Sequence, residues 1–242
     1  MRAFVLLASA QNPEEQLYVS RDGGSFAEDE ETRIANDFDL IGVEAAVQLK
    51  ASGALDEVVV FGMAPDEVQI RKALAMGADR GILAAVSNAA LVPERVVATA
   101  LAAMGETRDT VVFCGKMCVN FESGQVAQRL SVAMGCPCVC QAFEIARDRS
   151  GWRVLCEEDG GVPAFLLEAP FVVSVDLRLA TPRFPSFPSI LRARIKPVDV
   201  ISPAMATPLR TVSIVPDENA RRQCVMMEEG SFLAQLGGAL RG

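Results

Sequence analysis

The chain has 242 residues, half of them hydrophobic, and its 31 acidic and 23 basic residues give a formal net charge of −8. A chain of this length and apolar content can bury one large core. Its acidic balance, without a long basic block, disfavours nucleic-acid binding. No apolar run reaches the roughly 20 residues that a membrane-spanning helix needs, and the first residues lack the pattern of a signal peptide. We therefore expect a cytoplasmic protein without membrane insertion.

Strand-like and helix-like segments alternate along the first 134 residues. Continuous apolar runs, typical of buried parallel strands, cover residues 2–10, 57–63, 80–85 and 110–116. Apolar residues at helical spacing predict helices at 36–53, 65–77, 93–104 and 123–134, and Asn36 or Asp37 is expected to cap the first of them. The alternation predicts an α/β fold with a doubly wound, mostly parallel, Rossmann-like sheet.

The pattern changes after residue 137. Short apolar segments at 138–146, 152–157, 164–167 and 171–175 are separated by brief polar turns, which favours antiparallel hairpins at one edge of the sheet. Another hairpin is expected at 18–26, around Asp22-Gly23-Gly24. From residue 201 the chain is weakly patterned, with a short strand at 212–215 and a weak helix at 228–240. We expect one α/β domain over 1–200, followed by an arm over 201–242 that lies on another surface.

The candidate site is the strand–loop–helix segment from Gly115 to Val126. In a doubly wound sheet, ligands lie beyond the carboxyl ends of the strands, where helix N-termini present unpaired N–H groups. The Ser123 hydroxyl and the close backbone approach at Gly124 suit one phosphate group, although an ordinary turn into a helix has the same residues. The G-x-G-x-x-G and Walker patterns are absent, and without histidine a classical catalytic triad is excluded. The pattern favours a binding protein over an enzyme.

A second candidate surface follows the strand at 171–175. Segment 176–196 has prolines at 182, 185 and 188, and it is rich in basic residues. Proline removes an N–H and fixes φ, so we expect an ordered, projecting loop. Its apolar residues beside cations, which include Phe184 and Phe187, suit protein docking. The alternative is a core loop with a solvated basic rim.

Cys136, Cys138 and Cys140 alternate and would share one face of a strand. A metal site needs further Cys or His ligands at short spacing, and the chain has no histidine. We therefore expect three free thiols that pack as small hydrophobic groups, and no metal.

Several of these motifs resemble one family. Asp176-Leu-Arg-Leu179, Pro182-Arg183 and Pro188 with its following basic run are similar to the signature of the electron-transfer flavoprotein β subunit. The helix that opens at Asn36-Asp-Phe-Asp39 and the segment Ala73-Leu-Ala-Met-Gly-Ala-Asp-Arg-Gly-Ile82 also resemble that family. The resemblance covers nearly the whole chain.

The resemblance implies that this chain is the non-catalytic β subunit of an αβ heterodimer. In that reading the α partner carries the redox-active FAD, and this chain holds AMP as a structural ligand. Its further partners would be a donor dehydrogenase and a quinone reductase, and the arm at 201–242 would pack on the α subunit. The AMP site carried over from the family consists of Ala8, Asn36, Asp37, Phe38, Asp39, Gly62, Gly115, Lys116, Ser123, Gly124, Gln125 and Val126. The implied docking residues are Arg183, Phe187, Ile190, Leu191, Arg192 and Arg194.

The chain departs from the family pattern near the nucleotide loop. Met117-Cys-Val-Asn-Phe-Glu122 stands where the family has Gln-Ala-Ile-Asp-[DG]-Asp, and Ser9-Ala-Gln-Asn12 lacks a usual lysine. The nucleotide therefore stays open between AMP, the second FAD of electron-bifurcating relatives, and none. The alternative function from another class is a stand-alone regulatory protein that binds an adenine nucleotide.

Overall fold

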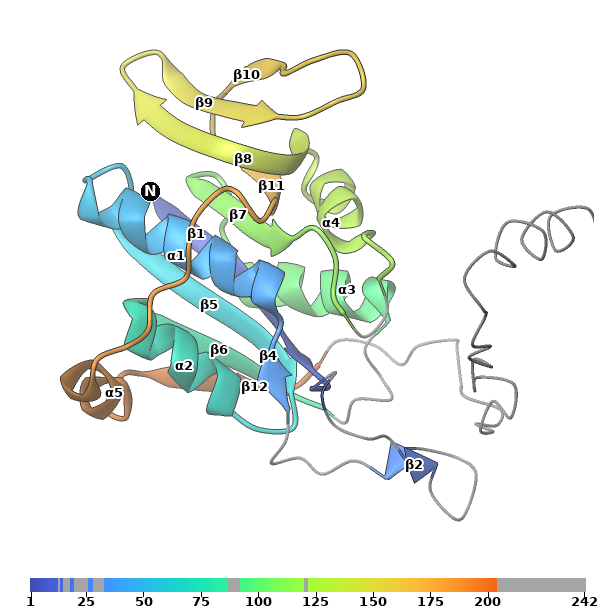
Figure 1. Ribbon diagram of the computed structural model, residues 1–242, viewed down its shortest axis with the longest axis vertical. Helices are drawn as coiled ribbons and strands as arrows, with labels where there is room; N and C mark the ends of the chain where they lie inside the picture. The colour runs from blue at the N-terminus through green and yellow to red at the C-terminus, as the bar shows by residue number, and fades with distance from the viewer. Residues whose placement is uncertain are drawn as a thin grey trace, which may run out of the picture.

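The computed structural model describes residues 1–12, 14, 18–19, 26–27, 33–86, 92–119 and 122–203. In this part of the chain, one large sheet is flanked by helices (Figure 1). Its strands are β1 (Arg2–Ala10), β4 (Ile34–Ala35), β5 (Glu57–Ala64), β6 (Arg80–Ala85), β7 (Thr110–Gly115), β8 (Cys138–Asp148), β9 (Gly151–Cys156), β10 (Ala164–Leu167), β11 (Phe171–Val175) and β12 (Val198–Ile201). The helices are α1 (Asp37–Ala51), α2 (Val68–Met76), α3 (Pro93–Met104), α4 (Val126–Met134) and α5 (Phe187–Ala193).

The strand order is β10-β9-β8-β11-β7-β1-β5-β6-β12, and β4 pairs with β1 outside this path. From β1 the chain builds outward through β5 and β6, and it then returns to place β7 on the other side of β1. The strand order therefore reverses between β1 and β7, which is where an open α/β sheet has its binding crevice. The expected doubly wound, mostly parallel sheet is confirmed.

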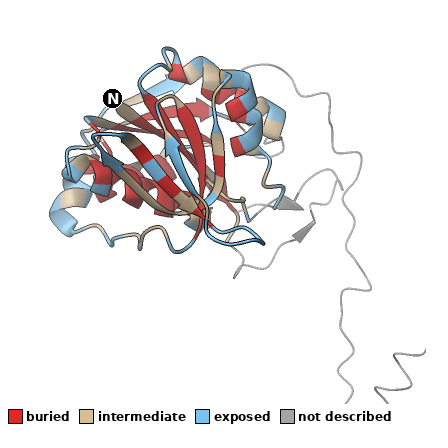
Figure 2. Cartoon of the chain, turned by 90° about the horizontal axis from the view of Figure 1, so that it is seen from above, coloured by how far each residue is buried: buried red, intermediate tan, exposed pale blue. Residues whose placement is uncertain are grey.

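Both faces of the central parallel strands β1, β5, β7 and β11 are buried (Figure 2). Residues of β1 alternate between two apolar clusters, with Val5 on the face covered by α1 and α2 and Phe4 on the face covered by α3 and α4. This period of two follows from the strand pleat. A strand buried on both sides reads as a continuous apolar run, which is why β1, β5 and β7 were visible in the sequence.

The antiparallel edge is confined to β8, β9 and β10, which form one end of the sheet in Figure 1. The sequence placed β11 with these hairpins, and that prediction was wrong. β11 lies inside the sheet and pairs in parallel with both β7 and β8. Every residue of β11 is buried, as is typical of an interior parallel strand.

The proline-rich segment is also more regular than a projecting loop. It contains the helix α5, and Pro188 lies in the first turn of α5, where a missing N–H costs little. Beyond α5, β12 pairs in parallel with β6. Two side chains join α5 to α2: Arg71 Nη1 donates to the Ala193 and Lys196 carbonyls at 2.8 and 2.7 Å, and Lys196 Nζ donates to the Leu74 carbonyl at 3.0 Å.

Several smaller expectations differ at their boundaries. Helices α2 and α4 each begin three residues later than predicted, at Val68 and Val126. Asn36 occupies the position before α1 but makes no side-chain capping bond. β2 (Tyr18–Val19) and β3 (Phe26–Ala27) pair as the expected antiparallel hairpin. The turn at 22–24 and the tail elements at 212–215 and 228–240 lie outside the described residues. No helix in the described ranges is both long and apolar enough to cross a membrane.

Candidate functional site

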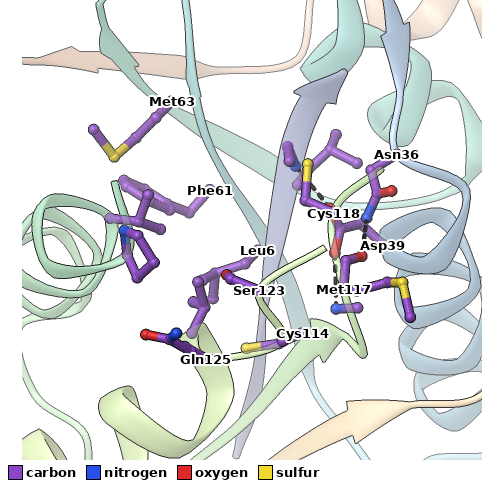
Figure 3. Close-up of a pocket in the computed structure, with 17 residues that line it drawn as sticks. Leu6, Asn36, Asp39, Phe61, Met63, Cys114, Met117, Cys118, Ser123 and Gln125 are labelled. Carbon is purple, nitrogen blue, oxygen red and sulfur yellow. Dashed lines mark hydrogen bonds between the residues drawn. The ribbon is translucent and has the colours of Figure 1, made fainter. Parts of the chain in front are cut away.

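A cavity opens at the carboxyl ends of β1 and β7, where the strand order reverses (Figure 3). The empty space in it is about 770 Å³ when the part open to solvent is included. Asn36, Asp39, Met117 and Cys118 lie on one side of the view, and Phe61 and Met63 lie on the other. The residues that line the cavity are Leu6, Leu7, Ala8, Asn36, Asp39, Phe61, Met63, Pro93, Val96, Cys114, Gly115, Met117, Cys118, Ser123, Gly124, Gln125 and Val126.

Asp39, in the first turn of α1, joins the two strand ends. Its Oδ2 accepts a hydrogen bond from the Ala8 N–H at 2.8 Å, and its Oδ1 accepts one from the Gly115 N–H at 2.7 Å. Burial of the carboxyl raises its pKa to about 6, because desolvation outweighs the hydrogen bonds from Ala8, Asn36 and Gly115. Because the Asp39 carboxyl group accepts hydrogen bonds from both strand ends, it fixes the distance between β1 and β7 at the mouth of the site.

Asn36 supplies an unused acceptor in the cavity wall. Asn36 is 1% exposed, and its backbone N–H donates to the Ala8 carbonyl at 3.0 Å. Its side-chain Nδ2 donates to the Met117 carbonyl at 2.9 Å and thereby holds the loop after β7. Its Oδ1 is buried and has no hydrogen-bond partner within the described ranges. A buried acceptor left unpaired costs about 1–3 kcal/mol, so this oxygen suits a ligand N–H or O–H group.

The backbone at Gly115 has no room for a side chain. A Cβ there would lie 2.5 Å from Asp39 Oδ1 and 2.8 Å from Phe38 Cβ. The short contact between β7 and the first turn of α1 therefore requires glycine at this position.

The loop into α4 forms the remaining wall. Gly124 has a φ of +58°, which glycine adopts without strain. Helix α4 begins at Val126, and the preceding Gln125 makes no side-chain capping bond. The N–H groups of the first turn are consequently open to an acceptor, with the positive end of the helix dipole behind them.

Charge is scarce in this wall. None of the described residues that line the cavity is a lysine or arginine. Lys116, next in sequence to the cavity, has its Nζ 3.4 Å from Asp176 Oδ2 and 5.2 Å from the centre of the Phe38 ring. Burial, with the Asp39 carboxylate nearby, raises the pKa of Cys114 and keeps this thiol protonated. The wall of the site is mostly apolar, and its polar groups include those of Asn36, Asp39 and the start of α4.

The structure brings together most, but not all, of the residues that the resemblance implied. Those in the cavity wall are Ala8, Asn36, Asp39, Gly115, Ser123, Gly124, Gln125 and Val126. Those outside it are Asp37, Phe38, Gly62 and Lys116. A Cβ on Gly62 would meet Ile70 of α2, whereas its neighbours Phe61 and Met63 point to the cavity face. The apolar wall from β5 and α3, with Leu6 and Leu7 of β1, was missed, because a continuous apolar run does not show which of its residues face the cavity.

The implied docking residues gather on and around α5. Phe187 is 72% exposed, and Ile190 and Leu191 are each nearly half exposed. Phe184, at 98%, extends the same apolar surface. Arg192 and Arg194 are exposed on it.

Arg183 differs from the other implied docking residues. Its Nε and Nη2 each donate to the buried Glu44 carboxylate of α1 at 2.7 Å. Burial alone would raise the pKa of Glu44, but the hydrogen bonds from Arg183 and Gln48 outweigh it and lower that pKa. Arg183 therefore anchors the segment to α1.

Comparisons with known proteins agree with the resemblance seen in the sequence. The electron transfer flavoprotein domain family matches residues 23–206. The electron transfer flavoprotein subunit beta of Bradyrhizobium diazoefficiens is 37% identical over 166 residues, which are 67% of this chain and 66% of that protein. The subunit beta of Syntrophomonas wolfei is 35% identical over 212 residues, 85% of this chain and 82% of that protein. The human subunit beta is 36% identical over 175 residues, 69% of this chain and 68% of that protein. The chain belongs to the electron transfer flavoprotein β-subunit family.

Proposed function

We propose that this chain is the β-type half of a two-chain electron transfer flavoprotein and that it holds AMP as a structural ligand. In this proposal the redox-active FAD is carried by an α-type partner. The observation that carries the AMP assignment is the buried, unpaired Oδ1 of Asn36 in a mostly apolar cavity at the reversal point of the sheet. Residues 1–200 form the nucleotide-binding domain, and 201–242 form the arm that packs on the partner.

The base is expected in the apolar part of the cavity. Phe61, Met63 and Val96 present apolar surface from β5 and α3, which suits a flat aromatic ring. Adenine carries an amino group, and a donated N–H would satisfy the Asn36 oxygen. A ring without a donor would leave that oxygen unpaired at a cost of about 1–3 kcal/mol.

The phosphate is expected at the start of α4. The open N–H groups there and the Ser123 hydroxyl can accommodate one phosphate group. A triphosphate normally needs a cation or a glycine-rich phosphate loop, and the described lining residues include no lysine or arginine. The same scarcity of cations favours the monophosphate.

In electron transfer, this chain's own role is to bind the nucleotide and to position its protein partners. The Cys114 thiol in the cavity lining is held protonated by burial, with the Asp39 carboxylate nearby, which disfavours it as a nucleophile. The partner's FAD would supply the one-electron and two-electron chemistry. This chain would support the partner and present α5 to a donor dehydrogenase and to a quinone reductase, with Phe187, Ile190 and Leu191 as the apolar contacts.

The test is the nucleotide content of the complex. The chain is produced together with its α-type partner, the purified complex is denatured, and the released nucleotides are identified by mass spectrometry. We expect one AMP and one FAD per heterodimer. Two flavins per heterodimer would support a second FAD in this cavity instead of AMP. A colourless homodimer that retains an adenine nucleotide would overturn the electron-transfer assignment in favour of a regulatory protein.

The role of Asn36 in holding the loop after β7 is tested by a substitution that keeps the size of the side chain. Asn36→Asp keeps both heavy-atom positions but replaces the Nδ2 donor to Met117 by an oxygen. We expect the nucleotide content to fall at least about tenfold. Asn12→Asp, on an exposed part of the chain whose side chain accepts from the Glu14 N–H, is the matched control and should retain the nucleotide. Full AMP retention in Asn36→Asp would show that the Asn36–Met117 bond is not needed to hold the nucleotide.

A further inference from the structure

The starts of α3 and α4 meet at the rim of the cavity. Pro93 of α3 and Gln125, which directly precedes α4, both line it. An ion pair joins the two helices beside these residues, with Arg129 Nη1 of α4 lying 2.8 Å from Glu94 Oε1 of α3. The two side chains are 46% and 50% exposed, and a pair this open to solvent contributes little to stability. What the pair does is to hold the Arg129 guanidinium in place at the rim.

The same guanidinium fixes the orientation of a side chain in the cavity wall. Arg129 Nε donates to Gln125 Oε1 at 3.0 Å. A guanidinium group can only donate, so the Gln125 atom that faces it must be the amide oxygen and not the nitrogen. The Nε2 group is then left to donate elsewhere. In Figure 3 the amide nitrogen of Gln125 lies on the side of Leu6, and the oxygen lies on the outer side. Arg129 thus turns the donor of the amide towards the cavity.

This donor lies where the proposed nucleotide has acceptors. The phosphate of AMP is expected at the start of α4, and Gln125 is the residue directly before that helix. The oxygens of an ionised phosphate accept hydrogen bonds, and the amide adds a donor to the N–H groups of the first turn. With the amide reversed, its oxygen would face the phosphate, and two acceptors would repel each other.

Gln125 would not keep this orientation without support. Its side chain is long and exposed, and in water either end of the amide can face the cavity. Arg129 selects one orientation as long as its own guanidinium is held, and Glu94 holds it from α3. The three side chains therefore act as one unit.

We propose that Arg129 and Glu94 are positioning residues, which orient the Gln125 amide and thereby make the cavity selective for an ionised phosphate at its rim. The inference rests on the proposed function, in which the ligand is AMP. Neither Arg129 nor Glu94 lines the cavity, so both act on the ligand through Gln125.

The test is a charge swap, the double substitution Glu94→Arg with Arg129→Glu. The two helices keep an ion pair of reversed polarity. A carboxylate at position 129 can only accept, so the Gln125 amide must turn its nitrogen outward and its oxygen towards the cavity. The variant is produced in complex with its α-type partner, and the release of bound AMP is measured by exchange against excess isotopically labelled AMP. We expect release to become about tenfold faster, with an unchanged midpoint of urea unfolding.

The variant Gln125→Ala separates amide orientation from a direct effect of charge, because it has no amide to turn. The charge swap should therefore leave the AMP release rate of Gln125→Ala unchanged. An equal acceleration with and without Gln125 would overturn the proposal, since charge alone would then act on the phosphate. A charge swap that leaves release unchanged in the presence of Gln125 would overturn it as well.

The matched control is the ion pair between Arg153 of β9 and Glu144 of β8. Its side chains are 49% and 46% exposed, its Nη2–Oε1 distance is 2.6 Å, and neither residue lines the cavity. Swapping these two charges should alter neither AMP release nor unfolding. A wild-type complex without AMP would overturn the proposed function and this inference with it. A wild-type complex that holds AMP and responds to neither swap would overturn this inference alone.

Discussion

The cavity between β1 and β7 and the surface around α5 depend on different parts of the molecule. The cavity is held by buried bonds between distant residues: Asp39 binds the backbone of Ala8 and Gly115. The α5 surface consists of exposed side chains, with Phe187 at 72% exposure. A substitution in the cavity should therefore change stability and binding together. A substitution of Phe187 should change binding alone, since a largely exposed side chain contributes little to the stability of the fold.

The sharpest test of the cavity is Gly115→Ala. The new methyl group would lie 2.5 Å from Asp39 Oδ1, so either β7 or α1 must move and the bond from the Gly115 N–H is lost. We expect the free energy of unfolding, measured with urea, to fall by about 3–5 kcal/mol, together with loss of the nucleotide.

Gly160→Ala is the matched control for that measurement. A Cβ at Gly160 meets nothing within 4 Å, and its φ is not in the left-handed region. Its free energy of unfolding should stay within about 0.5 kcal/mol of the wild type. If Gly115→Ala changes the free energy of unfolding as little as Gly160→Ala does, the contact between β7 and α1 does not determine the cavity.

The Asp39 carboxyl predicts how stability varies with pH. Its pKa rises from 3.8 in the unfolded chain to about 6 in the fold. The folded state therefore binds the extra proton between these values, and stability falls as pH increases from about 4 to 6. The shift of roughly 2 pH units corresponds to about 3 kcal/mol. Urea unfolding across this range should show the decrease in the wild type, and Asp39→Asn should abolish it. An unchanged slope in the variant would assign the effect to another group.

The two regions also differ in how far sequence could predict them. Buried apolar runs identified β1, β5, β6 and β7 and hence the end of the sheet at which a site should lie. Such runs carry no polar–apolar alternation, so they cannot tell which residues face which layer. The family resemblance placed Gly62 in the site, whereas its neighbours Phe61 and Met63 line the cavity.

Long-range partners account for the remaining differences. Gly115 and Met117, which bond to Asp39 and Asn36 respectively, lie 76 and 81 residues from them in the sequence, so no local pattern could show these contacts. For α5 the prolines were read as loop-forming, but Pro188 begins a helix that Arg71 holds from α2. Exposure of Phe187 was predictable because a short basic, proline-rich segment has little to bury against. The ion pair between Arg183 and Glu44 was not predictable, because the two residues are 139 positions apart in the sequence.

Arg183 marks the boundary between the two regions, because it belongs to the exposed segment but binds a buried acid. Arg183→Ala would leave the Glu44 carboxylate buried with only Gln48 as a side-chain partner. Since the Arg183 side chain is itself 46% exposed, we expect a loss of about 2 kcal/mol on urea unfolding, below the 3–5 kcal/mol of a fully buried pair. Arg192→Ala, on the same segment, should lose almost nothing. Equal effects of the two substitutions would mean that Arg183 does not anchor the segment.

The smallest effect on stability, and the clearest on partner binding, is expected from Phe187→Ala. Truncating a side chain that is 72% exposed should change the free energy of unfolding by less than about 0.5 kcal/mol. If Phe187 is an apolar anchor, the same change should weaken the apparent affinity for the donor dehydrogenase about tenfold or more. The readout is the rate at which the donor reduces the heterodimer's flavin, with reduction by dithionite as the reference that needs no docking. Val132→Ala, at an 81% exposed apolar position on α4, removes exposed apolar surface from a different helix and should leave that rate unchanged. Equal rates for both variants would locate the docking surface elsewhere, whereas a loss specific to Phe187 with unchanged flavin content would separate docking from folding.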